Sequence, residues 1–351
     1  MEDKVHSKHD GGRASCKPVR MEHAQMIGMI GLGNLGTALA NVVATNGYGV
    51  LGWEYQAAVV SAINTKHENP QFLPGVLLDS KLHATNRLED VAEHCGTIFV
   101  ALPSRYIHAT LAPLRDQVPP STVLVNTAKG IDRNTGLTAA QTLTALFPAN
   151  GRVTLAGPSI ANEFARGLPT VVMLAGRPTG MLFGIARLLD NTHFRVRFSD
   201  DEIGVELGGV LKNAYVIGLG LFDGKQIASV NFRSVYLTLA LEEMTRIGVA
   251  LGGRADTFAY LAGMGDLLAT ALSDASHNRR MGQLLADDRS IGEIEHIMGV
   301  LPEGYNTIQT ILFVAEKLHV PAPLAKALWD VIGGRTTAQH FIDAFIKDFV
   351  A

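Results

Sequence analysis

One glycine-rich turn near residue 30 constrains the fold of this chain more than any other feature of its sequence. An apolar run at 26–30 leads into Gly31-Leu-Gly33-Asn-Leu-Gly36, and a segment of small and apolar residues follows at 37–44. A strand, a G-x-G-x-x-G turn and a helix in this order form the pyrophosphate-binding start of a dinucleotide-binding unit. Gly31 permits the tight turn, Gly33 lets the backbone approach the pyrophosphate, and Gly36 lets the helix pack closely on the strand. We therefore predict a dinucleotide at the N-terminus of this helix, with an ordinary glycine turn as the alternative.

Apolar runs recur between residues 25 and 198 and alternate with helical patterns. Strands are predicted at residues 26–30, 47–53, 96–102, 122–126, 153–156 and 170–175, and a helix at 57–66. Continuous apolar strands alternating with helices indicate a parallel sheet covered on both faces. We therefore predict an α/β fold in which residues 25–198 form a doubly wound cofactor-binding domain.

The pattern changes near residue 199. No strand-like run appears after Val196, and helical patterns cover residues 205–222, 232–250, 256–272, 291–300 and 305–318. We predict that residues 199–351 form an all-helical domain with the substrate and catalytic groups. A length of 351 residues also favours two domains, at about 150 residues each. Residues 1–24 are predicted to be a disordered leader, because they contain no apolar stretch.

Composition excludes several classes of protein. A net charge of −3 gives no broad nucleic-acid-binding surface, and no apolar run approaches the ~18 residues of a membrane span. Two cysteines, Cys16 and Cys95, cannot form a disulfide framework, which favours a reducing, cytoplasmic compartment. The histidines, such as His83, His94 and His193, do not have the spacing of metal ligands, so no metal is predicted.

The end of the second predicted strand indicates which dinucleotide binds. Glu54 lies 18 residues after Gly36, near the ~20 expected for the acid that binds the adenosine ribose. A carboxylate there accepts hydrogen bonds from the ribose diol and repels a 2′-phosphate. We therefore predict NAD rather than NADP as cofactor, with Glu54 and the adjacent Tyr55 among its contacts. A solvated loop acid is the alternative interpretation of Glu54.

Two lysines are candidates for the chemistry. Lys129 directly follows the strand at 122–126, and ligands of open α/β sheets bind beyond the carboxyl ends of strands. Lys212 and Asn213 interrupt an apolar helix, where an ammonium group needs a partner or a task. Burial and a second cation lower the pKa of a lysine toward working pH, as general acid–base catalysis requires. The alternative is a lysine whose ammonium group extends to the surface.

A third polar cluster lies at residues 263–280. Asp266 could pair with a catalytic lysine, and Asn278 and Arg279 supply donors suited to an anionic substrate or a pyrophosphate. A polar helix end with solvated arginines is the alternative.

These motifs, together with Asn69-Pro-Gln-Phe-Leu-Pro-Gly75, Ala156-Gly-Pro-Ser-Ile-Ala-Asn-Glu163 and Glu242-Glu-Met-Thr-Arg-Ile-Gly248, extend over residues 26–333. In them the chain resembles the NAD(P)-dependent glycerol-3-phosphate dehydrogenases, particularly the bacterial type. The resemblance implies a Rossmann domain followed by a helical domain, an active site in the cleft between them, and a homodimer. It also implies that glycerol 3-phosphate and dihydroxyacetone phosphate are interconverted.

The resemblance also implies roles for single residues. Lys212 would be the proton acceptor and donor for the substrate C2 oxygen, flanked by Lys129 and Asp266. The substrate contacts would be Gly157, Ser159, Asn213, Thr270, Ser276, His277, Asn278 and Arg279. The cofactor contacts would be Asn34, Leu35, Lys129, Ala161, Leu301 and Glu303.

The chain departs from the family pattern at two places. His277 stands where the family's Ser-Arg-Asn-Arg loop has its first arginine, and residues 237–241 have no charge where the family has an arginine. Both changes remove a cation near an expected phosphate. Two rival hypotheses therefore remain: a divergent paralogue that reduces another small ketone in a specialised pathway, and a weakly catalytic NAD-binding sensor. Retention of Lys129, Lys212 and Asp266 argues against the sensor.

Overall fold

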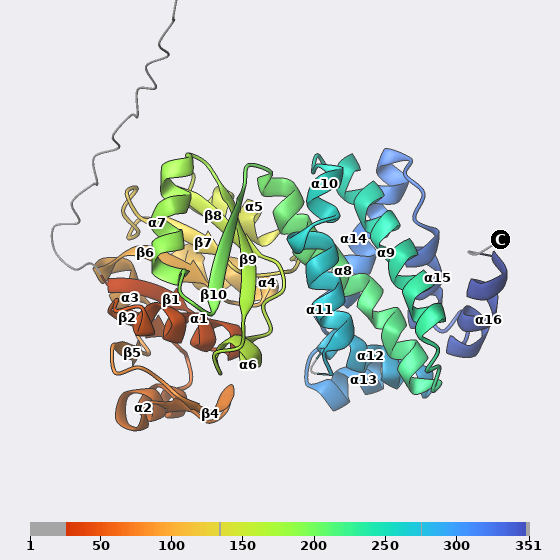
Figure 1. Ribbon diagram of the computed structural model, residues 1–351, viewed down its shortest axis with the longest axis horizontal. Helices are drawn as coiled ribbons and strands as arrows, with labels where there is room; N and C mark the ends of the chain where they lie inside the picture. The colour runs from red at the N-terminus through yellow and green to blue at the C-terminus, as the bar shows by residue number, and fades with distance from the viewer. Residues whose placement is uncertain (1–25, 133–134, 275, 349–351) are drawn as a thin grey trace, which may run out of the picture.

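The computed structural model describes residues 26–132, 135–274 and 276–348. A sheet covered by helices and a bundle of helices lie side by side (Figure 1). The leader predicted at residues 1–24 lies outside the described residues. The division predicted between residues 198 and 199 falls at the last strand of the sheet and stays a prediction.

The sheet has eight strands in the order β10-β9-β8-β7-β6-β1-β2-β5. These strands are β1 (Met26–Ile30), β2 (Val50–Trp53), β5 (Leu82–Thr85), β6 (Cys95–Val100), β7 (Val123–Asn126), β8 (Arg152–Ala156), β9 (Thr170–Gly176) and β10 (Phe194–Ser199). A separate hairpin pairs β3 (Glu68–Asn69) with β4 (Leu73–Leu77). All six predicted strands are confirmed, whereas β5 and β10 of the sheet and the hairpin strands β3 and β4 were not predicted. β10 also continues past Val196, where the sequence pattern had indicated that strands end.

The sheet is not wholly parallel, which corrects the prediction. β8 and β9 pair antiparallel, although β10 then runs parallel to β9. A parallel connection needs a crossover that is usually an α-helix lying across the sheet. The segment at 157–169 contains only the four-residue helix α6 (Ala161–Phe164), so the chain turns back instead. This turn keeps Gly157 and Ser159 at the carboxyl end of β8.

Helices cover both faces of the sheet, as predicted. They are α1 (Asn34–Thr45), α2 (Ala57–Lys66), α3 (Leu88–His94), α4 (Ser104–Leu111), α5 (Ala139–Leu146) and α7 (Thr179–Leu189), with a short turn η1 (Ala112–Leu114) after α4. Side chains of α1, α2 and α7 pack into one apolar core and those of α3, α4 and α5 into another. The fold is therefore the predicted doubly wound α/β arrangement.

The second half of the described chain is helical. Its helices are α8 (Glu202–Gly224), α9 (Val230–Ala250), α10 (Ala255–Phe258), α11 (Asp266–Leu272), α12 (His277–Ala286), α13 (Ile291–Met298), α14 (Glu303–Leu318), α15 (Pro323–Ile332) and α16 (Ala338–Asp348). The other helices enclose α8, whose residues from Gly204 to Phe222 are all buried. Among the described helices, only α8 is long and apolar enough to cross a membrane, and its whole apolar window is buried inside the protein.

The single helix predicted at 256–272 is wrong. The chain instead forms α10, a π-helical turn η2 (Leu261–Gly265) and then α11. A Cβ on Gly263 would lie 2.2 Å from the Phe258 carbonyl oxygen, and one on Gly208 of α8 would lie 2.6 Å from the Ala262 carbonyl oxygen. These close approaches need glycine, and they start α11 at Asp266, beside α8.

Candidate active site

A cleft of about 560 Å³ lies between the sheet and the helical bundle. The glycine turn and the carboxyl ends of β6, β7 and β8 line one side, and α8, α11, α12 and α14 line the other. A larger hollow of about 1200 Å³ lies between α7, β10 and α10, but neither lysine lines it. The cleft with both lysines is therefore the candidate active site.

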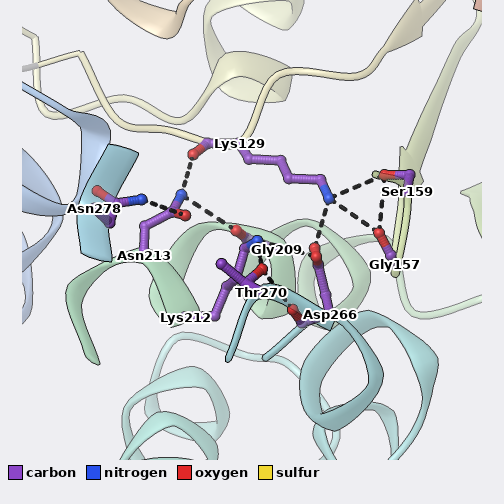
Figure 2. A network of polar contacts seen from close by, with 9 residues as sticks. All are labelled: Lys129, Gly157, Ser159, Gly209, Lys212, Asn213, Asp266, Thr270 and Asn278. Carbon is purple, nitrogen blue, oxygen red and sulfur yellow. Dashed lines mark hydrogen bonds and ion pairs between the residues drawn. The ribbon is translucent and has the colours of Figure 1, made fainter. Parts of the chain in front are cut away.

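One carboxylate holds both lysines. Asp266 Oδ1 lies 3.0 Å from Lys212 Nζ, and Asp266 Oδ2 lies 2.6 Å from Lys129 Nζ (Figure 2). Lys212 also donates a hydrogen bond to Thr270 Oγ1, and Thr270 donates in turn to the Asp266 backbone carbonyl at 2.7 Å. The side chains of Lys212 and Asp266 are 8% and 3% exposed. The predicted pairing of Asp266 with a lysine is confirmed, and Lys212 does not extend to the surface.

The environment of Lys212 shifts its proton affinity. The pKa of the Lys212 ammonium is lowered to about 8, mainly by burial and also by the Lys129 charge, while the Asp266 carboxylate opposes the decrease. Loss of hydration disfavours the charged form of any buried amine. Both the ammonium and the neutral amine are therefore populated near neutral pH, which suits a group that gives and takes a proton.

A chain of hydrogen bonds joins Lys129 to the helical bundle. Its Nζ donates to the Gly157 carbonyl oxygen at 3.0 Å and to Ser159 Oγ at 3.2 Å (Figure 2). Asn213 Nδ2 donates to the Lys129 carbonyl oxygen at 2.8 Å, and Asn278 Nδ2 donates to Asn213 Oδ1 at 3.0 Å. The structure thus brings together predicted residues from the loop after β8, from α8 and from α12 around Lys129, the first two at its ammonium group and the others through its backbone carbonyl.

The glycine turn has the shape that a dinucleotide needs. Gly31 has φ +97°, and a Cβ on Gly36 would lie 1.9 Å from the Gly31 carbonyl oxygen. Gly33 caps α1 without a side-chain hydrogen bond, and a Cβ there would meet nothing within 4 Å. The first N–H groups of α1 are thus left for a pyrophosphate at the cleft, which Asn34 and Leu35 also line. The residues present fit a bound dinucleotide.

Glu54 is buried beside this turn. Its Oε1 accepts a hydrogen bond from the Gln56 amide at 3.1 Å. Burial raises the pKa of the Glu54 carboxyl, and hydrogen bonds from the backbone of Gln56 and Leu32 oppose that rise. Since Leu32 belongs to the glycine turn, Glu54 lies beside that turn and is not a solvated loop acid. Tyr55, by contrast, is 73% exposed, and neither residue lines the cleft itself.

The far wall of the cleft comes from α14 and the loop before it. Leu301 and Glu303 line it, and Ala161 lies opposite on α6. Glu303 Oε1 accepts hydrogen bonds from the Ser104 amide at 3.0 Å and from Ser104 Oγ at 2.9 Å. This contact joins the first turn of α4 to the first turn of α14 across the cleft.

The three residues after Ser276 do not point the same way. Ser276 Oγ accepts from the Arg279 amide at 3.3 Å and caps α12, so His277, Asn278 and Arg279 form the first turn of a helix. Successive residues of a helix point in different directions. His277 and Asn278 line the cleft, whereas the Arg279 guanidinium binds the Asp223 carboxylate. The predicted contact of Arg279 with substrate therefore has no support in this geometry.

Comparison with known proteins decides the family. The profile described as NAD-dependent glycerol-3-phosphate dehydrogenase N-terminus matches residues 26–181, and that of the C-terminus matches residues 201–343. This chain belongs to the NAD-dependent glycerol-3-phosphate dehydrogenase family. It is an NAD(P)-dependent oxidoreductase that acts on a CH–OH group.

Individual members of the glycerol-3-phosphate dehydrogenase family match over nearly their full length. The chain is 35% identical over 332 residues to "Glycerol-3-phosphate dehydrogenase [NAD(P)+]" of Geobacter sulfurreducens, covering 93% of this chain and 99% of that one. The protein of the same name from Carboxydothermus hydrogenoformans is 35% identical over 306 residues, 87% of this chain and 91% of that one. The crystal structure of the Coxiella burnetii glycerol-3-phosphate dehydrogenase superposes with a TM-score of 0.85 at 28% identity, covering 92% of this chain and 98% of that one.

Some residues in and around this dehydrogenase cleft were not predicted. Asn69 is fully buried and donates to the Leu32 carbonyl oxygen at 2.9 Å, so it supports the glycine turn. Asn162 accepts a hydrogen bond from Asn34 at 3.0 Å, and Arg105 lines the cleft from α4. Asn69 and Asn162 lie in motifs that carried the resemblance. Their polar side chains within those motifs could have indicated a role near the cleft. Arg105 had no such signal.

Proposed function

We propose that this protein interconverts glycerol 3-phosphate and dihydroxyacetone phosphate with NAD, and that Lys212 carries the proton. The observation that supports this most directly is a buried lysine with a pKa of about 8 in the cleft that the glycine turn faces. Substrate contacts are proposed for lining residues of the same cleft, which are Ser159, Asn213, Thr270, Ser276, His277 and Asn278. A substrate contact is also proposed for Gly157, whose carbonyl oxygen accepts a hydrogen bond from Lys129.

Lys212 serves both directions of the reaction. When bound, the nicotinamide supplies or accepts the hydride at the substrate C2 carbon. In reduction the Lys212 ammonium donates its proton to the C2 oxygen, and in oxidation the neutral amine accepts the hydroxyl proton. A pKa of about 8 keeps both forms within reach at cellular pH.

Lys129 and Asp266 set the charge around that proton. Two ammonium groups share one carboxylate, at 3.0 and 2.6 Å, which leaves the cluster with a net positive charge. A net positive cluster stabilises the negative charge that develops on the C2 oxygen during hydride transfer. Asn213 and Asn278 fix the backbone of Lys129, so this charge is held in position before substrate binds.

The Glu54 carboxylate favours NAD over NADP. It is 4% exposed beside the glycine turn, where a 2′-phosphate on the adenosine ribose would approach a buried acid. We further propose a cytoplasmic homodimer, with residues 25–198 and 199–351 as its domains. Light scattering of the purified protein tests the dimer.

A divergent paralogue that reduces another small ketone is the second candidate. The observation that favours it is His277, which lines the cleft where the family motif has an arginine, together with the pairing of Arg279 to Asp223. A histidine offers at most two donors, whereas an arginine presents a fork of five.

The deciding experiment measures NADH oxidation with dihydroxyacetone phosphate and with a panel of small ketones, including unphosphorylated dihydroxyacetone. We expect kcat/KM to be at least about 100-fold higher for dihydroxyacetone phosphate than for dihydroxyacetone, because charged phosphate contacts are lost in the latter. Efficient turnover of an unphosphorylated ketone, without this preference, would instead establish the paralogue. NADH binding without turnover of any ketone would establish the sensor.

A further inference from the structure

Arg105 is a charged side chain in the cleft that forms no ion pair with a carboxylate of the described residues. It belongs to the first turn of α4 and lines the cleft together with Leu301 and His277. Its Nη1 makes one long hydrogen bond, 3.4 Å, to the Leu301 carbonyl oxygen. Its Nε is buried and has no hydrogen-bond partner within residues 26–132, 135–274 and 276–348. A buried donor left unpaired is costly, so it points to a partner that binds later.

The other cations near the cleft are already committed. Lys129 and Lys212 share the Asp266 carboxylate, and Arg279 is bound to Asp223. Within the part of the chain that the structure describes, Arg105 alone among the lining lysines and arginines forms no ion pair. An anion that enters the cleft therefore meets, in Arg105, a guanidinium that forms no ion pair with any carboxylate of the described residues.

The Tyr106 ring holds Arg105 in place without neutralising it. Its guanidinium carbon lies 4.7 Å from the centroid of the Tyr106 ring, a cation–π contact that limits its rotation. Glu303 is the nearby acid, but its oxygens accept hydrogen bonds from Ser104 at 2.8 to 3.0 Å. Burial raises the pKa of the Glu303 carboxyl, which the Ser104 bonds and the Arg105 charge oppose. The guanidinium fork is thus positioned and available.

We propose that Arg105 binds a phosphate group in this cleft and takes over the task of the family arginine that His277 has replaced. The phosphate is either the monoester of the substrate or the diphosphate bridge of the cofactor. Both present tetrahedral anionic oxygens, which the planar fork of an arginine binds through two parallel hydrogen bonds. This inference rests on the proposed function insofar as it assigns a phosphorylated substrate.

The test compares Arg105→Gln with the parent protein and with Arg115→Gln. Arg115 is an exposed arginine that follows η1, and it donates one hydrogen bond to the Ala145 carbonyl oxygen outside the cleft. The measurements are KM for dihydroxyacetone phosphate and, by fluorescence titration, Kd for NADH. We expect Arg105→Gln to raise one of these about 10- to 100-fold, as when charged hydrogen bonds are lost, and Arg115→Gln to change neither.

The pattern of changes identifies the phosphate. A raised KM with an unchanged NADH Kd assigns Arg105 to the substrate monoester, and a raised NADH Kd assigns it to the cofactor diphosphate. If Arg105 binds the substrate monoester, the double variant Arg105→Gln/His277→Arg should recover most of the lost affinity for dihydroxyacetone phosphate. The single variant Arg105→Lys should keep only part of the parent's affinity. If Arg105→Gln folds with the parent's Tm and leaves both constants within about twofold, the proposal is overturned.

Failure of the proposed function would look different. The parent would then not reduce dihydroxyacetone phosphate, whereas the NADH titration and a titration with inorganic phosphate would still report on Arg105. Weaker binding of NADH or of phosphate by Arg105→Gln would support the inference even then. No change in either titration would overturn it independently of the substrate.

Discussion

Replacing Asp266 by asparagine should move the pH dependence of the reaction in a predictable direction. The substitution keeps the size of the side chain but removes the negative charge 3.0 Å from Lys212 Nζ. An opposite charge at this range typically shifts a pKa by about 1–3 units in favour of the charged form. Without it, the Lys212 pKa should fall from about 8 to about 5–7.

The expected loss follows from the protonated fraction. At pH 7 a lysine of pKa about 8 is about nine-tenths ammonium, whereas one of pKa about 5–7 is about 1–50% ammonium. Reduction consumes the ammonium form, so its rate is highest below the pKa and falls as pH rises through it. We therefore expect kcat/KM for reduction at pH 7 to fall about 2- to 100-fold.

The assay is kcat/KM for dihydroxyacetone phosphate reduction between pH 5 and 9, for the parent, Asp266→Asn and Asp256→Asn. Asp256 is a matched control, because its side chain is 78% exposed and pairs with Arg254 outside the cleft. In the plot of kcat/KM against pH, the midpoint of the decrease at high pH should move from near pH 8 to about pH 5–7 only in Asp266→Asn. If this midpoint stays near pH 8 in a folded Asp266→Asn variant, the proposed effect of the Asp266 charge on Lys212 is refuted.

Three further predictions concern the surroundings of the cluster. Gly36→Ala should weaken NADH binding and lower Tm, because the new Cβ would lie 1.9 Å from the Gly31 carbonyl oxygen and overpacking costs about 1–3 kcal/mol; unchanged binding by titration would contradict this. Glu54→Arg should narrow or reverse a preference for NADH over NADPH in kcat/KM, and equal use of both by the parent would show that Glu54 does not select the cofactor. Arg279→Met should lower Tm by thermal unfolding and leave KM within a few-fold, since Arg279 binds Asp223; a large rise in KM at unchanged Tm would restore its predicted contact with substrate.

Much of the fold could be predicted because its signals are local. The glycine turn, the apolar strands and α8 each show a pattern within a short stretch of sequence. The reversal at β9 could not be predicted in this way, because a short apolar strand looks the same in either direction. The break before α11 depends on how closely Gly208 and Gly263 approach other parts of the backbone, which is a tertiary property.

Part of the candidate site could also be predicted from local sequence. Lys212 could be predicted because a lysine inside an apolar helix is unusual, and Asp266 could be predicted as its partner. The pairing of Arg279 could not be predicted, because its partner Asp223 lies on α8, which is distant in sequence, and its direction depends on the capping of α12 by Ser276. Arg105 was missed because an arginine in the first turn of an amphipathic helix is typical of a solvated face.

The central claim is that Lys212 carries the proton in this dehydrogenase, and Lys212→Met tests it most directly. Lys225→Met is the control, since Lys225 lies at the end of the same helix and outside the cleft. At saturating NADH and the preferred ketone, we expect Lys212→Met to lower kcat about 10²- to 10⁴-fold, with NADH Kd unchanged. A folded Lys212→Met that retains kcat within a few-fold of the parent would contradict the claim.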